Sequence, residues 1–224
     1  MSTEEVTGII TAHSASSHNN CMGMEDAELG EPGYILIDVE AVLMGKIKVV
    51  EQVAIVIMSM STGDEVLGER YMVYQPMTAE ELAQHYGKPV QMAQKSAEAY
   101  TRITGDTIVH DDPATNPTWS AVRNRVRKIC RRRAIRVYAK GAELERSVFN
   151  GAFPIDDLEL YGCPKYPGKL HNPLDECRFF SGYVPEIVAM RYSQQGIYMG
   201  RQALQYYPGQ QQQQERTFRV ISTS

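Results

Sequence analysis

The sequence contains no apolar run near the roughly 20 residues that a bilayer-spanning helix requires, which argues against a transmembrane protein. Cysteine is also scarce. The four cysteines lie far apart and form no CxxC pair, so the chain does not look like a small secreted disulfide scaffold. Its first residues are polar and acidic, whereas a secretory signal begins with positive charge and continues with an apolar stretch. We therefore expect an intracellular protein, nuclear or cytoplasmic, that is not secreted.

An excess of positive charge is missing as well. Lysine and arginine together number 23 and the acidic residues 27, which leaves a net charge of -4. A molecule with this balance is not drawn to polyanions as a whole, so any affinity for nucleic acid must come from a local basic patch or from bound cations. The proportions of apolar and charged residues are those of globular proteins, which argues against a disordered or fibrous chain.

The length of 224 residues is enough for one domain with a sizeable core. Residues 1–31 mix Ser, His, Asn, Gly and acids without an apolar period, and this composition predicts a flexible leader. A run of glutamines at residues 210–214 predicts that residues 206–224 form a polar tail. We expect the ordered domain to span residues 32–205.

Three apolar segments separated by short turns open this domain. They cover residues 34–40, 49–60 and 70–74, and they predict an antiparallel meander of three strands. Capping signals and helical periodicity follow. They predict a helix start at Thr78, helices over residues 92–100, 119–133, 142–149 and 173–180, and a strand over residues 134–139. This order predicts an α/β fold in which helices flank a mixed sheet, the meander plus parallel strands.

Two acids lie near the end of the first predicted strand, in the segment Asp38-Val39-Glu40. The two-residue period of a strand directs both carboxylates to the same face of the sheet. Two acids on a core strand are costly to bury, and they persist only where cations or partners neutralise them. The alternative is a strand end where both acids reach solvent. The two acids alone leave both interpretations open.

Three segments resemble the motifs of the DEDDh exonuclease family. Tyr34–Glu40 resembles the first motif, an apolar strand that ends in Asp-x-Glu and is followed by a hairpin. Tyr138–Glu145 resembles the second, in which a strand enters a helix that presents an acid on its first turn. His171–Cys177 resembles the third, in which a histidine precedes the last acid, here Glu176, by five residues. The family ordinarily has aspartate where this chain has Glu145 and Glu176.

The resemblance covers roughly residues 34–187 and implies a ribonuclease H-like fold, with a strand near residues 155–160. It also implies metal-dependent 3′-to-5′ hydrolysis of phosphodiester bonds at a single-stranded end of DNA or RNA. His171 would act as the general base, which its ordinary pKa suits. Two Mg²⁺ or Mn²⁺ ions would be held by four acids, namely Asp38, Glu40, Glu145 and Glu176.

A second hypothesis uses some of the same residues. Cys163, His171 and Cys177 lie within fifteen residues and could ligate zinc, with an acid such as Glu145 or Glu159 as the fourth ligand. The Maelstrom domains are relatives of this fold that carry a Glu-Cys-His-Cys zinc site. The resemblance therefore also admits a catalytically degenerate domain that binds nucleic acid or a protein partner. A histidine that binds zinc cannot also serve as the base.

Seven positive charges gather between Arg123 and Arg133. Such a stretch could contact phosphates or act as a nuclear-import signal. The alternative is the solvated face of a helix whose Val122, Val126 and Ile129 pack inward at helical spacing. Both interpretations remain open from the sequence.

Overall fold

The computed structural model describes residues 32–191. The predicted leader, the last part of the predicted domain (192–205) and the predicted tail (206–224) lie outside the described residues. Within residues 32–191, no helix combines the length and the apolar character that a membrane span requires.

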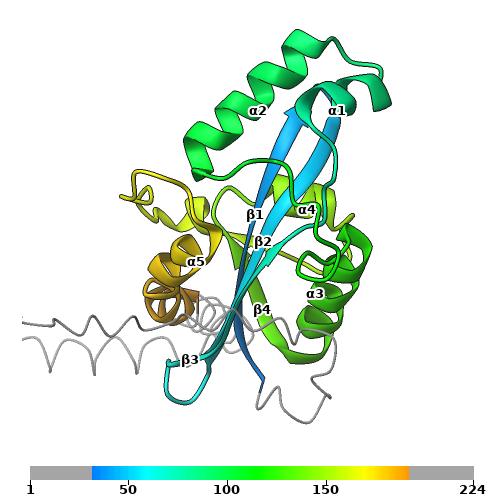
Figure 1. Cartoon of the computed structure of the whole chain (residues 1–224). Coiled ribbons are helices and arrows are strands. Elements are labelled where there is room, and N and C mark those ends of the chain that lie inside the picture. Colours follow the sequence, from blue (N-terminus) through cyan, green and yellow to red (C-terminus); the bar gives the residue numbers. More distant parts are fainter. Residues whose placement is uncertain (1–31, 192–224) are drawn as a thin grey trace, which may run out of the picture. The chain divides into compact units, whose positions relative to one another are not determined.

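Five strands form one mixed sheet in the order β3-β2-β1-β4-β5 (Figure 1). They are β1 (Gly33–Met44), β2 (Ile47–Ser59), β3 (Glu65–Met72), β4 (Ala134–Ala139) and β5 (Asp156–Asp157). The first three pair antiparallel as a meander, while β4 pairs parallel with β1 and β5 pairs parallel with β4. This is a ribonuclease H-like sheet, so the fold class predicted from the sequence is confirmed.

Helices cover both faces of the sheet, with α3 on one side and α5 on the other (Figure 1). The helices are α1 (Ala79–His85), α2 (Val90–Thr104), α3 (Trp119–Arg133), α4 (Glu143–Val148), the 3₁₀ helix η2 (Leu158–Tyr161) and α5 (Pro173–Ser181). Residues 184–191 are again helical. The predicted start at Thr78 is confirmed as a capping box with Glu81. Helices α1 and α2 pack against the end of the β1–β2 hairpin at which the chain turns, around Val42, Met44 and Val49.

Strand alternation decides which residues of β1 face α5. Leu36 of β1 packs in one buried cluster with Cys177 and Phe180 of α5. Because side chains two apart share a face, Asp38 and Glu40 lie on this same side of the sheet. The first acids of the candidate site therefore face the helix that carries the last one.

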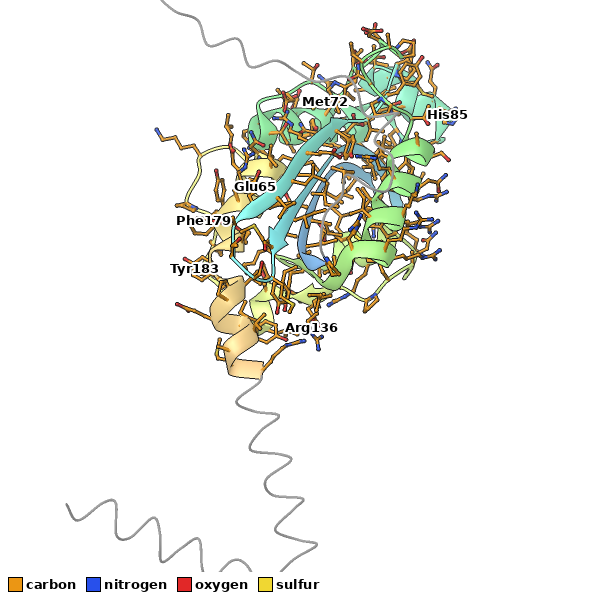
Figure 2. All side chains as sticks on the ribbon, turned by 90° about the horizontal axis from the view of Figure 1, so that it is seen from below. Glu65, Met72, His85, Arg136, Phe179 and Tyr183 are labelled. Atoms are coloured by element: carbon orange, nitrogen blue, oxygen red, sulfur yellow. The ribbon has the colours of Figure 1, made fainter. Side chains whose placement is uncertain are left out.

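Helix α5 is also fastened to the edge strand. The guanidinium of Arg178 donates to both carboxylate oxygens of Glu65 on β3, at 2.9 and 2.8 Å. Figure 2 labels Glu65 and Phe179, the residue that follows Arg178 on α5. This bidentate contact joins α5 to the outermost strand of the meander.

Most helix boundaries follow the sequence pattern, but three strands depart from it. β1 continues to Met44, beyond the predicted end at residue 40, and β3 covers Glu65–Met72 where residues 70–74 were predicted. The family-like strand expected over residues 155–160 is limited to Asp156–Asp157, and η2 follows at once. The side chain of Asp157 accepts a hydrogen bond from the backbone N–H of Glu159 at 2.9 Å. This cap turns the chain out of the strand after two residues.

Candidate metal centre

Glu145 joins the two acids of β1 through a backbone hydrogen bond. It lies in the first turn of α4 and is 2% exposed. Its Oε1 accepts from the backbone N–H of Val39, the residue between Asp38 and Glu40, at 3.2 Å. Its Oε2 is buried and has no hydrogen-bond partner within residues 32–191. One oxygen thus holds the Glu145 carboxyl at β1, and the other is available to a ligand.

The turn between β4 and α4 is held by a residue that was not among the predicted site residues. The Asp157 carboxylate accepts from the backbone N–H of Gly141 at 3.0 Å and from that of Ala142 at 3.1 Å. Gly141 has a φ of 66°, a conformation that glycine adopts without steric cost. The glycine was the available signal for a tight turn here. Nothing in the local sequence indicated that an acid 16 residues away would complete it.

Glu176 enters the site from the start of α5. Asn172 caps this helix by accepting from the backbone N–H of Leu174 at 3.1 Å, and Pro173 occupies its first position. Glu176 is then directed toward the sheet and is 7% exposed. This arrangement follows from the capping signals that the sequence shows.

His171 lies just before α5 and contacts the last acid. Its Nδ1 lies 2.5 Å from Oε1 of Glu176, and about half of its side chain is exposed. Possible ligand atoms of Glu40, His171 and Glu176 all lie within 4.8 Å of one another. The predicted base and two of the predicted acids therefore share one small region at the surface end of the site.

All four acids have a raised pKa. Burial, followed by the charge of Glu176, raises the pKa of Asp38 to about 8. Burial and the charges of Asp38, Glu176 and Glu145 raise the pKa of Glu40 to about 9. Burial and the charge of Asp38 raise the pKa of Glu145 to about 8, and burial raises that of Glu176 to about 7. Without a cation, the folded chain therefore disfavours ionising the four acids together.

The donor set fits a hard divalent cation. Within residues 32–191, Oδ2 of Asp38 and Oε2 of Glu145 are buried without a hydrogen-bond donor. Buried polar atoms are ordinarily satisfied, so atoms left in this state point to a missing partner. Carboxylate oxygens are the ligands that Mg²⁺ and Mn²⁺ prefer. A cation among these acids would also reverse the pKa shifts, because it favours the ionised form.

The two cysteines of the zinc hypothesis are not grouped with His171. Cys177 is buried beside Leu36 and Phe180, and Cys163 packs against the edge of that cluster. Burial, and then the charge of Asp38, raises the pKa of the Cys177 thiol, which favours its protonated form. The group of possible ligands found within residues 32–191 contains His171 but neither cysteine. The structure thus does not bring the two thiols to His171.

The basic helix α3 lies on the face of the sheet away from α5 (Figure 1). Its buried residues are Val122, Val126, Ile129 and Cys130, so the inward apolar stripe predicted from the sequence is present. Several of its cations serve internal contacts. Arg125 pairs with Glu69 at 3.0 Å, and Arg127 donates to the carbonyl of Phe149 at 3.0 Å. These contacts give part of the basic stretch a structural use.

Comparison with known proteins gives a distant structural likeness and no family. No protein-family model matches the chain, and neither does any curated protein. One similar solved structure is an ExoI/SSB-Ct complex, with a TM-score of 0.34 and 11% sequence identity. The match covers 58% of this chain and only 29% of that chain. A likeness with so low a TM-score supports no conclusion on the fold or the activity of this chain.

Proposed function

We propose that this chain is a metal-dependent nuclease that hydrolyses phosphodiester bonds in DNA or RNA. The 3′-to-5′ direction is proposed from the family resemblance alone. One observation carries the proposal: possible ligand atoms of Glu40 on β1 and Glu176 on α5 lie within 4.8 Å of each other beside His171, and buried oxygens of Asp38 on β1 and Glu145 on α4 have no donor within the described chain. Such an arrangement is costly unless cations complete it.

The residues have roles that suit phosphodiester hydrolysis, which requires an attacking water and neutralisation of charge on the phosphoryl oxygens. Bound Mg²⁺ or Mn²⁺ would supply that neutralisation and would lower the pKa of water. Asp38 and Glu40 would hold the ions from β1. Glu145 and Glu176 would hold them from the two helices that close on that strand.

His171 would accept the proton of the attacking water. Its Nδ1 faces Glu176 at 2.5 Å, which leaves Nε2 as the nitrogen available to a water or substrate. The neighbouring carboxylate would stabilise, by its charge, the imidazolium that forms when Nε2 takes a proton. The half-exposed position of the ring gives solvent and substrate access to that nitrogen.

A matched pair of variants on α4 tests the proposal. Glu145→Gln keeps the size of the buried side chain but removes its charge, and it should lower Mn²⁺-dependent cleavage of a labelled single strand by about 100-fold or more. Glu143→Gln makes the same change at an exposed position of the same helix and should leave cleavage within about twofold of the wild type. If both variants cleave as well as the wild-type chain, the site is misassigned.

Metal analysis separates the nuclease from a zinc-stabilised, non-catalytic domain. Two weak Mg²⁺ or Mn²⁺ sites that disappear in Asp38→Asn support the nuclease. One tight zinc that disappears in both His171→Ala and Cys177→Ser would instead support the binding domain.

A further inference from the structure

Gln52 is a buried polar residue beside the candidate metal centre. It lies on β2 directly opposite Glu40 of β1 and is 0% exposed. Its Nε2 donates to the hydroxyl of Tyr100 at 2.9 Å and to Oδ2 of Asp106 at 2.6 Å. A carboxylate can only accept, so the contact with Asp106 determines that the amide presents its nitrogen on that side.

Both acceptors belong to the carboxyl end of α2. Tyr100 lies in the last turns of this helix, and Asp106 follows two residues after its end at Thr104. Asp106 also receives a hydrogen bond from Arg70 on β3 at 3.0 Å. Gln52 therefore joins the end of α2 to the middle of the sheet, next to a strand that carries two of the site acids.

The same end of α2 holds the backbone of His171. The carbonyl of Ile103 accepts from the backbone N–H of His171 at 2.6 Å. Two residues after Ile103, Gly105 has a φ of 75°, and a Cβ there would lie 3.0 Å from a methyl group of Leu170. The segment before α5 thus packs closely on the turn that Gln52 anchors.

We infer that Gln52 is a positioning residue for His171. Its two hydrogen bonds anchor the end of α2, and the Ile103 carbonyl then places His171 relative to Glu40. This inference rests on the proposed nuclease function. Within residues 32–191, the side chain of Gln52 donates to Tyr100 and Asp106, and it forms no hydrogen bond with His171 or with the side chain of a proposed ligand. Its effect should therefore appear in the rate of the chemical step rather than in metal or substrate binding.

Gln52→Met tests the inference with little change in volume. The substitution removes both donated hydrogen bonds but leaves Asp106 paired with Arg70, so no buried charge loses its last partner. Tyr100→Phe removes one of the two acceptors and keeps the ring. The matched control is Gln94→Met, because Gln94 is exposed on α2 and its amide donates to Glu98 of the same helix at 3.3 Å.

The first readout is hydrogen exchange at the amide of His171, which reports its bond to Ile103 without any assay of activity. We expect this amide to exchange about tenfold faster in Gln52→Met, less so in Tyr100→Phe, and unchanged in Gln94→Met. The buried amide of Leu36 in β1 should keep its protection in all three variants.

The second readout is steady-state cleavage at saturating Mn²⁺. We expect kcat to fall about 10-fold to 100-fold in Gln52→Met, while KM and the affinity for Mn²⁺ stay within about twofold. Unchanged exchange at His171 would overturn the inference, as would a change in Mn²⁺ affinity as large as that in kcat. A wild-type chain that cleaves nothing would refute the nuclease proposal, and the exchange data would still decide whether Gln52 positions His171.

Discussion

Glu145 shows how a single side chain can serve the fold and the site together. One carboxylate oxygen accepts from the backbone of Val39, and the other is buried without a donor within residues 32–191. The DEDDh resemblance leads one to expect aspartate at this position. The longer side chain of Glu145 instead reaches from α4 to the backbone N–H of Val39 on β1. Glutamate therefore suits the distance between this position of α4 and β1.

Glu145→Asp should therefore impair the protein even though it restores the residue typical of the family. Shortening the side chain withdraws the carboxyl by roughly 1 Å and lengthens or breaks the bond to Val39. We expect the free energy of unfolding to fall by about 1–3 kcal/mol and the affinity for Mn²⁺ to decrease. Urea denaturation and calorimetric titration measure the two effects. A variant as stable and as active as the wild type would mean that the Val39 bond does not position the acid.

The bounds of helices and strands were predicted best where several local signals in the sequence agree. The bounds of α3 and β4 match the prediction because Thr118 caps the helix and the apolar stripe of α3 follows a helical period. The short β5 could not be predicted from its own residues. It ends early because Asp157 caps η2 through the backbone N–H of Glu159, and the same carboxylate also accepts from Ala142 in the β4–α4 turn, 15 residues away.

Asp157→Ala should disturb the candidate site through that turn. The substitution leaves the N–H groups of Gly141, Ala142 and Glu159 without their acceptor. We expect a loss of about 1–3 kcal/mol in the free energy of unfolding, together with weaker Mn²⁺ binding, because α4 carries Glu145 directly after this turn.

Asp156→Ala provides the control for this prediction. Asp156 forms ion pairs with Arg136 at 3.2 Å and Arg191 at 3.0 Å, and its carboxylate is part exposed. Such surface pairs contribute about 1 kcal/mol or less each, and they do not contact the α4 turn. Equal losses of Mn²⁺ affinity in the two variants would show that Asp157 has no special role.

Over the whole molecule, the raised pKa values of the acids link stability to pH. The folded chain holds protons on Asp38, Glu40, Glu145 and Glu176 up to pKa values of about 7 to 9. The unfolded chain releases them near pH 4. The metal-free protein should therefore become less stable as the pH rises from about 4 to about 9. Glu51 adds to this trend, because burial raises its pKa to about 8, but it is not a proposed ligand.

Divalent cations should reverse this trend, since they bind the ionised acids and release their protons. We expect saturating Mn²⁺ to raise the Tm more at pH 8.5 than at pH 6, as measured by scanning calorimetry. Glu143→Gln should behave like the wild type, whereas Glu145→Gln should show a much smaller gain. An equal gain at both pH values would mean that Mn²⁺ does not bind these acids.

The four candidate ligands could be proposed from sequence because each lies in a segment that resembles a DEDDh motif: an apolar strand that carries Asp-x-Glu, a strand entering a helix, and a helix start preceded by histidine. The contacts that hold these ligands and His171 in place could not be predicted from the sequence. The contact of Gln52 with Asp106 joins residues 54 positions apart, and that of Val39 with Glu145 joins residues 106 apart. None of these four residues is of an unusual type for its place in the sequence. Only the folded structure therefore shows which elements these contacts join.

Asp38, Glu40, Glu145 and Glu176 are proposed to form one site for divalent cations, and anomalous diffraction from crystals soaked in Mn²⁺ would locate the ions. We expect two manganese peaks roughly 4 Å apart, each bound by carboxylate oxygens of these four residues. Absence of manganese from this cluster at saturating concentration, or a metal bound only by Cys163 and Cys177, would contradict this proposal.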